Sequence, residues 1–242
     1  MEFASFLKSV RSDGERIVLV ARDQLGADVP PCPGWQVRDV LNHVAQVYEQ
    51  KIVCTLLQRD PDPWPPDWPA DRDPTEWLAD AQRRLLELFT ERGAAAPSYT
   101  WWPADQTVGF WARRMAHETV IHRVDVELSC GPSTPVNPEV AVDGVDEVLT
   151  IVLAGDWSDA PADQCRGQRI AVRTGGRGWE VELQREAVNV YPPRGRVDAE
   201  VQGDPEEVLL WLWGRGPVTR LTQVGDASIA TLLRDRLKLA TQ

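Results

Sequence analysis

Two histidines and a glutamate are spaced so that they could bind a divalent metal ion. Glu118 and His122 lie four residues apart within the segment RMAHETVIHRVD. Four residues advance an α-helix by one turn and about 40°, so both side chains project from one helix face. His43 stands between Val40 and Val47 at the three-and-four spacing of another helix's apolar face. Two histidines and one carboxylate suit Zn²⁺ or another divalent metal and leave positions open for water or substrate.

Helix geometry separates the third histidine from this set. His117 and His122 are five residues apart, about 140° around the same helix, and are poorly placed to share a metal. The zincin motif H-E-x-x-H is excluded as well, because Ile121 follows His117 at the position where it needs histidine. A simpler alternative stays open: His43 is a hydrogen-bonded core histidine, and Glu118 with His122 is an ordinary helix-surface pair.

Several neighbouring residues are weaker candidates. Asp125 follows His122 by three residues and could orient its ring, although a carboxylate on the helix surface is the simpler expectation. Arg114 and Arg123 are predicted on solvated faces. A cysteine such as Cys32 could extend the ligand set, but no spacing in the sequence requires it.

Helices must position these residues in the first half of the chain. Apolar residues recur there at helical spacing, and turn signals separate four predicted helices at residues 2–25, 37–58, 73–93 and 107–129. Asp73 and Pro74 provide a cap and a first-turn proline for the third helix. The proline-rich residues 59–74 cannot be helical. We expect a loop there, packed over the bundle by Trp64 and Trp68.

The second half of the chain has a different sequence pattern from the first. A helical stretch at residues 138–154 is followed by runs of alternating polarity, and the turn TGGRG between the first two runs is a hairpin signal. Strands are expected at residues 169–174, 179–184, 186–191 and 197–203, and helices at 204–215 and 228–240. The sequence therefore predicts an α+β protein of two domains, a four-helix bundle at residues 1–135 and a small α+β domain at 136–242.

Charge and composition limit the partners. The chain of 242 residues has a formal net charge of −11 and no Lys/Arg cluster, which argues against nucleic acids and anionic membranes. No stretch approaches the roughly 20 apolar residues of a membrane span. The four cysteines form no C-x-x-C pair, which fits reduced thiols. We expect a cytoplasmic protein that is a monomer or a weak homo-oligomer and acts on small molecules.

Three segments resemble one protein family. CPGWQVRDVLNHVAQV, with Trp35, Asp39 and His43 at four-residue spacing, resembles the N-terminal helix of the mycothiol-dependent maleylpyruvate isomerase family. RMAHETVIHRVDVE is similar to the second signature of that family, and VDAEVQGDPEEVLLWLWGR resembles part of its C-terminal domain. The resemblance implies a DinB-like bundle followed by a domain with a fold similar to sterol carrier proteins.

The resemblance also implies a chemistry. Zn²⁺ held by His43, Glu118 and His122 would bind the thiol of mycothiol and stabilise its thiolate, which is the nucleophilic form. The thiolate would add to a small electrophile such as a conjugated carbonyl or an epoxide, and the outcome would be isomerisation or S-transfer. Arg215, in WLWGRG, matches an arginine implicated in the isomerase. The alternative for Arg215 is an arginine that caps the end of a helix.

Two other functions are compatible with the sequence. The 11 tryptophans and a sterol-carrier-like domain could serve a non-catalytic module that binds an apolar ligand, with a structural metal. Structural zinc normally has four protein ligands, however, and three are apparent here. A metal-dependent hydrolase would use the open position to activate water, with Asp125 or Asp39 as the base.

Overall fold

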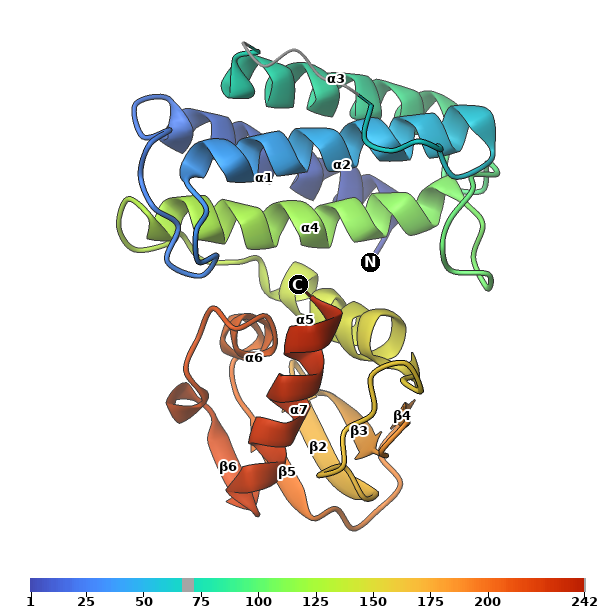
Figure 1. The fold of residues 1–242 in the computed structure, drawn as a ribbon, viewed down its shortest axis with the longest axis vertical. Helices are drawn as coiled ribbons and strands as arrows, with labels where there is room; N and C mark the ends of the chain where they lie inside the picture. The colour runs from blue at the N-terminus through green and yellow to red at the C-terminus, as the bar shows by residue number, and fades with distance from the viewer. Residues whose placement is uncertain (67–71, 242) are drawn as a thin grey trace. The chain divides into compact units, whose positions relative to one another are not determined.

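The computed structural model describes residues 1–66 and 72–241, and Trp68 lies outside them. The chain forms two compact units, Met1–Thr134 and Pro135–Gln242 (Figure 1). The first unit is helical, and the second combines helices with a six-stranded sheet. The α+β fold class expected from the sequence is therefore confirmed. No helix within the described residues is both long and apolar enough to cross a membrane.

The first unit contains four long helices, α1 (Phe3–Ala21), α2 (Val37–Leu57), α3 (Pro74–Arg92) and α4 (Val108–Leu128). α3 begins as expected, because the side chain of Asp73 accepts hydrogen bonds from the backbone of Thr75 and Glu76. α1 ends four residues before the predicted position. The backbone after it turns and accepts hydrogen bonds from the first turn of α2, so it cannot continue the helix.

The connection from α2 to α3 contains neither helix nor strand in its described residues, as the prolines predict. Trp64 is half-buried there. α4 runs alongside α1 and α2 (Figure 1), and most of its residues are buried. Residues on all sides of α4 are consequently buried, although its sequence carries charges throughout.

Three expectations about α4 are wrong for this reason. Arg114 and Arg123 were expected on solvated faces, but their side chains are only 9% and 3% exposed. Asp125 was expected on the surface and is fully buried. Buried charges must be paired to be tolerated, and each of the three has an oppositely charged or ionisable partner within hydrogen-bonding distance.

The second unit is built on one sheet with the strand order β1-β4-β3-β2-β5-β6. All neighbouring strands are antiparallel except β2 and β5. α7 packs against β2 and β5 (Figure 1). The hairpin predicted at TGGRG is present between β2 and β3. The strands are β1 (Gly155–Asp156), β2 (Gln168–Thr174), β3 (Arg177–Leu183), β4 (Ala187–Tyr191), β5 (Ala199–Gln202) and β6 (Thr222–Gly225).

The helices of this unit differ from expectation mainly at their ends. α5 (Pro138–Glu147) passes into a π-helical segment, Val148–Leu153, so the helical stretch predicted at residues 138–154 contains two kinds of helix. α6 (Pro205–Leu212) ends before Arg215, because Gly214 adopts a left-handed conformation that favours glycine and terminates helices. α7 (Ala227–Ala240) matches the predicted terminal helix. The short strands β1 and β6 were not predicted.

Candidate metal centre

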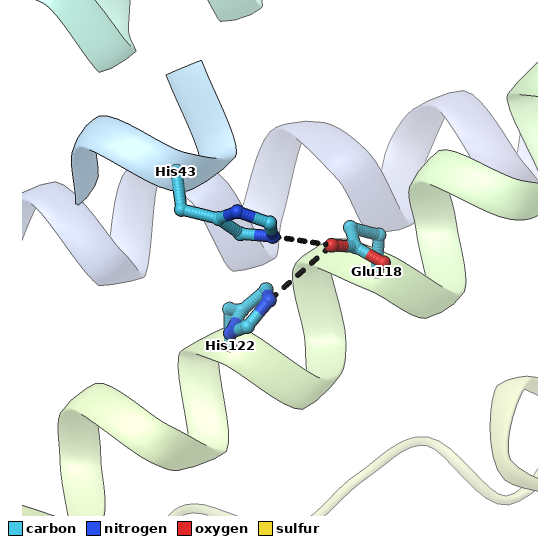
Figure 2. A group of neighbouring side chains, drawn as sticks. All are labelled: His43, Glu118 and His122. Atoms are coloured by element: carbon cyan, nitrogen blue, oxygen red, sulfur yellow. Dashed lines mark hydrogen bonds and ion pairs between the residues drawn. The ribbon is translucent and has the colours of Figure 1, made fainter. Parts of the chain in front are cut away.

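The three candidate ligands converge between α2 and α4. Glu118 Oε1 lies 3.1 Å from His43 Nε2 and 3.2 Å from His122 Nε2, so both imidazoles point at one carboxylate oxygen (Figure 2). One potential ligand atom from each residue lies within 4.8 Å of the other two. Glu118 and His122 are largely buried, with side chains 15% and 11% exposed, while the His43 side chain is 36% exposed. One side of the group therefore reaches solvent.

These distances fit a divalent metal ion. Ligand atoms about 2.1 Å from a tetrahedral zinc are about 3.4 Å from one another. The two measured nitrogen–oxygen separations are only slightly shorter, so small side-chain movements would admit the cation. The donor set also fits, because two imidazole nitrogens and one carboxylate leave a fourth position for an exogenous ligand.

The motif that contains His43 explains how that histidine is placed. Asp39 Oδ2 accepts a hydrogen bond of 2.8 Å from the backbone nitrogen of Gln36 and so fixes the start of α2. The Trp35 ring meets the His43 ring edge to face, with centroids 5.3 Å apart. Each member of the spacing Trp35, Asp39, His43 thus has a structural task, and only the histidine belongs to the metal cluster.

A buried hydrogen bond holds α2 in register with α4 beside the cluster. The hydroxyl oxygens of Tyr48 and Thr119 lie 2.5 Å apart. Thr119 donates its own proton to the carbonyl of Met115, so Tyr48 must donate to Thr119. This contact joins the two helices one residue from Glu118, and it limits sliding that would separate the glutamate from His43.

His122 is oriented by a carboxylate behind it. Its Nδ1 lies 3.0 Å from Asp125 Oδ2, which directs Nε2 toward Glu118. Burial alone would lower the pKa of His122, but the hydrogen bonds to Asp125 and Glu118 outweigh it and raise the pKa to about 9. Cys32 donates to the same Asp125 oxygen at 3.6 Å. The cysteine therefore approaches the centre through Asp125 and not as a member of the cluster.

Glu118 is held from its other side by an arginine. Arg114 Nη2 lies 2.6 Å from Glu118 Oε2, while Oε1 faces the histidines. Burial alone would raise the pKa of Glu118. The hydrogen bonds from His122 and His43 and the charge of Arg114 reverse this effect and hold the pKa well below its usual value. The carboxylate is consequently ionised and ready to bind a cation.

A second buried cation lies further along the same helices. Lys51 Nζ is 4.4 Å from the ring centroid of Trp111 and donates to the side chain of Gln50. Burial lowers the pKa of Lys51 to about 8. The positive charges of Lys51 and Arg114 interact there with the negative charge of Glu118.

Two remaining candidates make other contacts. His117 is fully buried on a different side of α4, where its ring meets Phe6 of α1 edge to face. Arg215 belongs to the second unit, where its guanidinium donates to the carbonyl of Trp213. Sequence reasoning missed the role of Arg114, and it gave the role found for Asp125 only as the less favoured alternative. Their spacing of four residues before Glu118 and three after His122 was a usable signal, but their burial was not visible in the sequence.

Two family models match most of the chain. The model described as the mycothiol maleylpyruvate isomerase N-terminal domain matches residues 11–127, and the corresponding C-terminal domain model matches residues 139–230. The chain belongs to the mycothiol-dependent maleylpyruvate isomerase family. The N-terminal match includes the three candidate metal ligands, and the C-terminal match includes Arg215.

Solved structures agree with this family membership. The crystal structure of a mycothiol-dependent maleylpyruvate isomerase is 14% identical, with a TM-score of 0.58, and covers 94% of this chain and 95% of its own. A point mutant of a mycothiol-dependent maleylpyruvate isomerase is 15% identical with a TM-score of 0.62 at the same coverage. At this identity the likeness shows a shared fold. No curated protein matches the chain.

Proposed function

We propose that this family member is a metal-dependent enzyme that activates a low-molecular-weight thiol, mycothiol, for reaction with a small electrophile. The observation that carries the proposal is the convergence of His43 and His122 on one oxygen of an ionised Glu118. These three residues would hold Zn²⁺ or a similar cation. A bound cation of this kind stabilises the thiolate form of a thiol at neutral pH.

The protein's own residues prepare this chemistry. Asp125 fixes the ring of His122, and Arg114 fixes the carboxylate of Glu118. The positive charges of Lys51 and Arg114 near Glu118 would favour a negatively charged sulfur over a neutral thiol. Addition of the thiol to a conjugated carbonyl followed by its expulsion gives isomerisation, and retention of the thiol gives S-transfer. We assign Arg215 to the same reaction because it matches the family's C-terminal motif.

The positions of two aspartates favour a thiol over water as the nucleophile. A hydrolase of this design would need a carboxylate to take a proton from water. Asp39 is engaged with the backbone of Gln36, and Asp125 is fully buried against His122. Neither carboxylate is placed to act as that base.

The experiment is to measure bound metal in the purified protein and in three variants. Wild type is expected to carry about one equivalent of a divalent metal, and His43→Ala and Glu118→Ala are expected to lose it. His117→Gln is the matched control, because it alters a buried histidine of α4 that faces α1, and it should retain the metal. Full metal occupancy in both ligand variants would overturn the site. Mycothiol consumption is then followed with maleylpyruvate and with epoxides, to separate isomerisation from S-transfer.

A further inference from the structure

The two oxygens of Glu118 have different surroundings. Oε1 faces Nε2 of His43 and of His122 at 3.1 and 3.2 Å. Oε2 faces away from them and accepts a hydrogen bond of 2.6 Å from Arg114 Nη2. A carboxylate can bind a metal through one oxygen or through both, so the partner of the second oxygen bears on which of the two occurs.

The contact with Arg114 has the features of a strong hydrogen bond and occupies Oε2. Both partners are charged, their separation is at the short end of the range for such hydrogen bonds, and the side chains are only 9% and 15% exposed. Ion pairs shielded from water are weakened little by solvent or salt. Arg114 also lies one helical turn before Glu118, so α4 itself keeps the guanidinium next to the carboxylate.

We propose that Arg114 is a positioning residue that makes Glu118 a ligand through Oε1 alone. This inference rests on the proposed function, since it concerns how the metal ligand is presented. Arg114 has a second effect through its charge, which offsets the charge of the carboxylate. A cation held by the three ligands would then keep more of its positive charge, and this would favour an anionic sulfur at the open position.

The same helix contains a matched control. Arg123 and Glu127 are also four residues apart, are also joined at 2.6 Å and are also buried, with both side chains 3% exposed. Glu127 accepts its other hydrogen bonds from Arg16 and Thr134 and takes no part in the metal cluster. Loss of Arg123 therefore removes a buried arginine–glutamate pair from α4 without changing the environment of Glu118.

The test uses Co²⁺, whose visible absorption bands report coordination number. Wild type, Arg114→Met, Arg114→Lys and Arg123→Met are loaded with Co²⁺, and the Co²⁺ affinity is measured by competition with a chelator. In R114M we expect weaker, shifted bands, because Glu118 now offers both oxygens. We also expect Co²⁺ affinity to rise, because Glu118 then binds through two oxygens and the repulsion between the Arg114 charge and the cation is lost. R114K keeps the charge but not the planar fork, so its affinity should be closer to wild type while its bands still shift.

The outcomes separate this inference from the proposed function. R123M should unfold more easily but show the wild-type spectrum and affinity while folded. Wild-type bands in both R114M and R114K would overturn the positioning role, and so would the same spectral shift in R123M. If R114M does not fold, the spectrum of R114K decides. If wild type binds no Co²⁺, or Glu118→Ala binds it as tightly as wild type, the metal site itself is wrong.

Discussion

Helix α4 carries two arginine–glutamate pairs that are nearly identical as local structures. In each, an arginine lies four residues before a glutamate, the charged atoms are 2.6 Å apart, and both side chains are largely buried. In the Arg123–Glu127 pair, Arg16 of α1 and Thr134, which follows α4, complete the hydrogen bonds of the glutamate. In the Arg114–Glu118 pair, the second carboxylate oxygen faces two histidine nitrogens.

The difference shows that the residues opposite each glutamate decide its role. Glu127 faces hydrogen-bond donors and stabilises the fold, whereas Glu118 faces two histidines that are candidate metal ligands. Hydrogen-bond donors saturate Glu127, which leaves it no oxygen to offer a cation. The donors opposite Glu118 are imidazoles, which become metal ligands when they lose a proton. Both carboxyl groups have lowered pKa values despite burial, and the pKa of Glu118 lies further below its usual value.

The largest expected effect comes from substituting the two glutamates one at a time. One substitution should reduce metal affinity, and the other should reduce the stability of the fold. Glu118→Gln should lower metal affinity by more than about 100-fold, since it removes a ligand and not merely the partner of one. Glu127→Gln should leave metal affinity unchanged and reduce the free energy of unfolding by about 3 kcal/mol, because it leaves buried arginine charge incompletely paired. Chelator competition measures the affinity, and urea unfolding in the presence of EDTA measures the stability.

Two results would contradict this prediction. If E127Q loses metal as fully as E118Q while remaining folded, the two glutamates are not distinct in function. If E118Q keeps the metal, the cluster between α2 and α4 is a buried hydrogen-bond network and nothing more.

The next effect concerns the aspartates that support the two regions. Asp125 holds His122, and Asp13 accepts a hydrogen bond of 2.9 Å from Arg123. Asp125→Asn should reduce metal affinity about 10- to 100-fold, because the ring of His122 loses its charged acceptor. Asp13→Asn should alter stability without altering affinity. A D13N protein with weakened metal binding would show that the regions are coupled through the helix.

Local spacing predicted the helices, the hairpin and the shared helix face of Glu118 and His122. The convergence of His43 with these two residues brings two helices together, and the family resemblance was needed to favour it over a hydrogen-bonded core histidine. Capping by Asp73, the alternation in β2 and β3, and the helical phase of Glu118 and His122 are all properties of short segments. The burial of Arg114, Arg123 and Asp125 was not predictable in this way. The burial follows from the packing of other parts of the protein around α4. The charged sequence of α4, taken alone, predicts a solvated helix.

Acid should reduce the contribution of both glutamates to the free energy of unfolding, but to different extents. A carboxyl group with a folded-state pKa below its unfolded value of 4.5 adds stability above pH 4.5, and this is lost as pH falls through the folded pKa. In metal-free protein, the stability difference between wild type and E118Q should therefore shrink below pH 4.5. The E127Q difference should shrink less, because the Glu127 pKa is less depressed. Urea unfolding at a series of pH values measures both, and equal pH dependence would contradict the ranking.

The smallest effect is expected from a third pair with the same spacing. Arg83 and Glu87 of α3 lie 2.9 Å apart, but their side chains are 56% and 63% exposed. Water and salt screen such a contact, and ordering two long side chains opposes it. Arg83→Met should therefore leave the urea midpoint and the metal affinity indistinguishable from wild type. A loss of stability in R83M comparable to that in R123M would mean that helical spacing, and not burial, sets the strength of these pairs. A null result would leave burial and the opposing side chains as the features that distinguish Glu118 and Glu127 from the many surface glutamates of the chain.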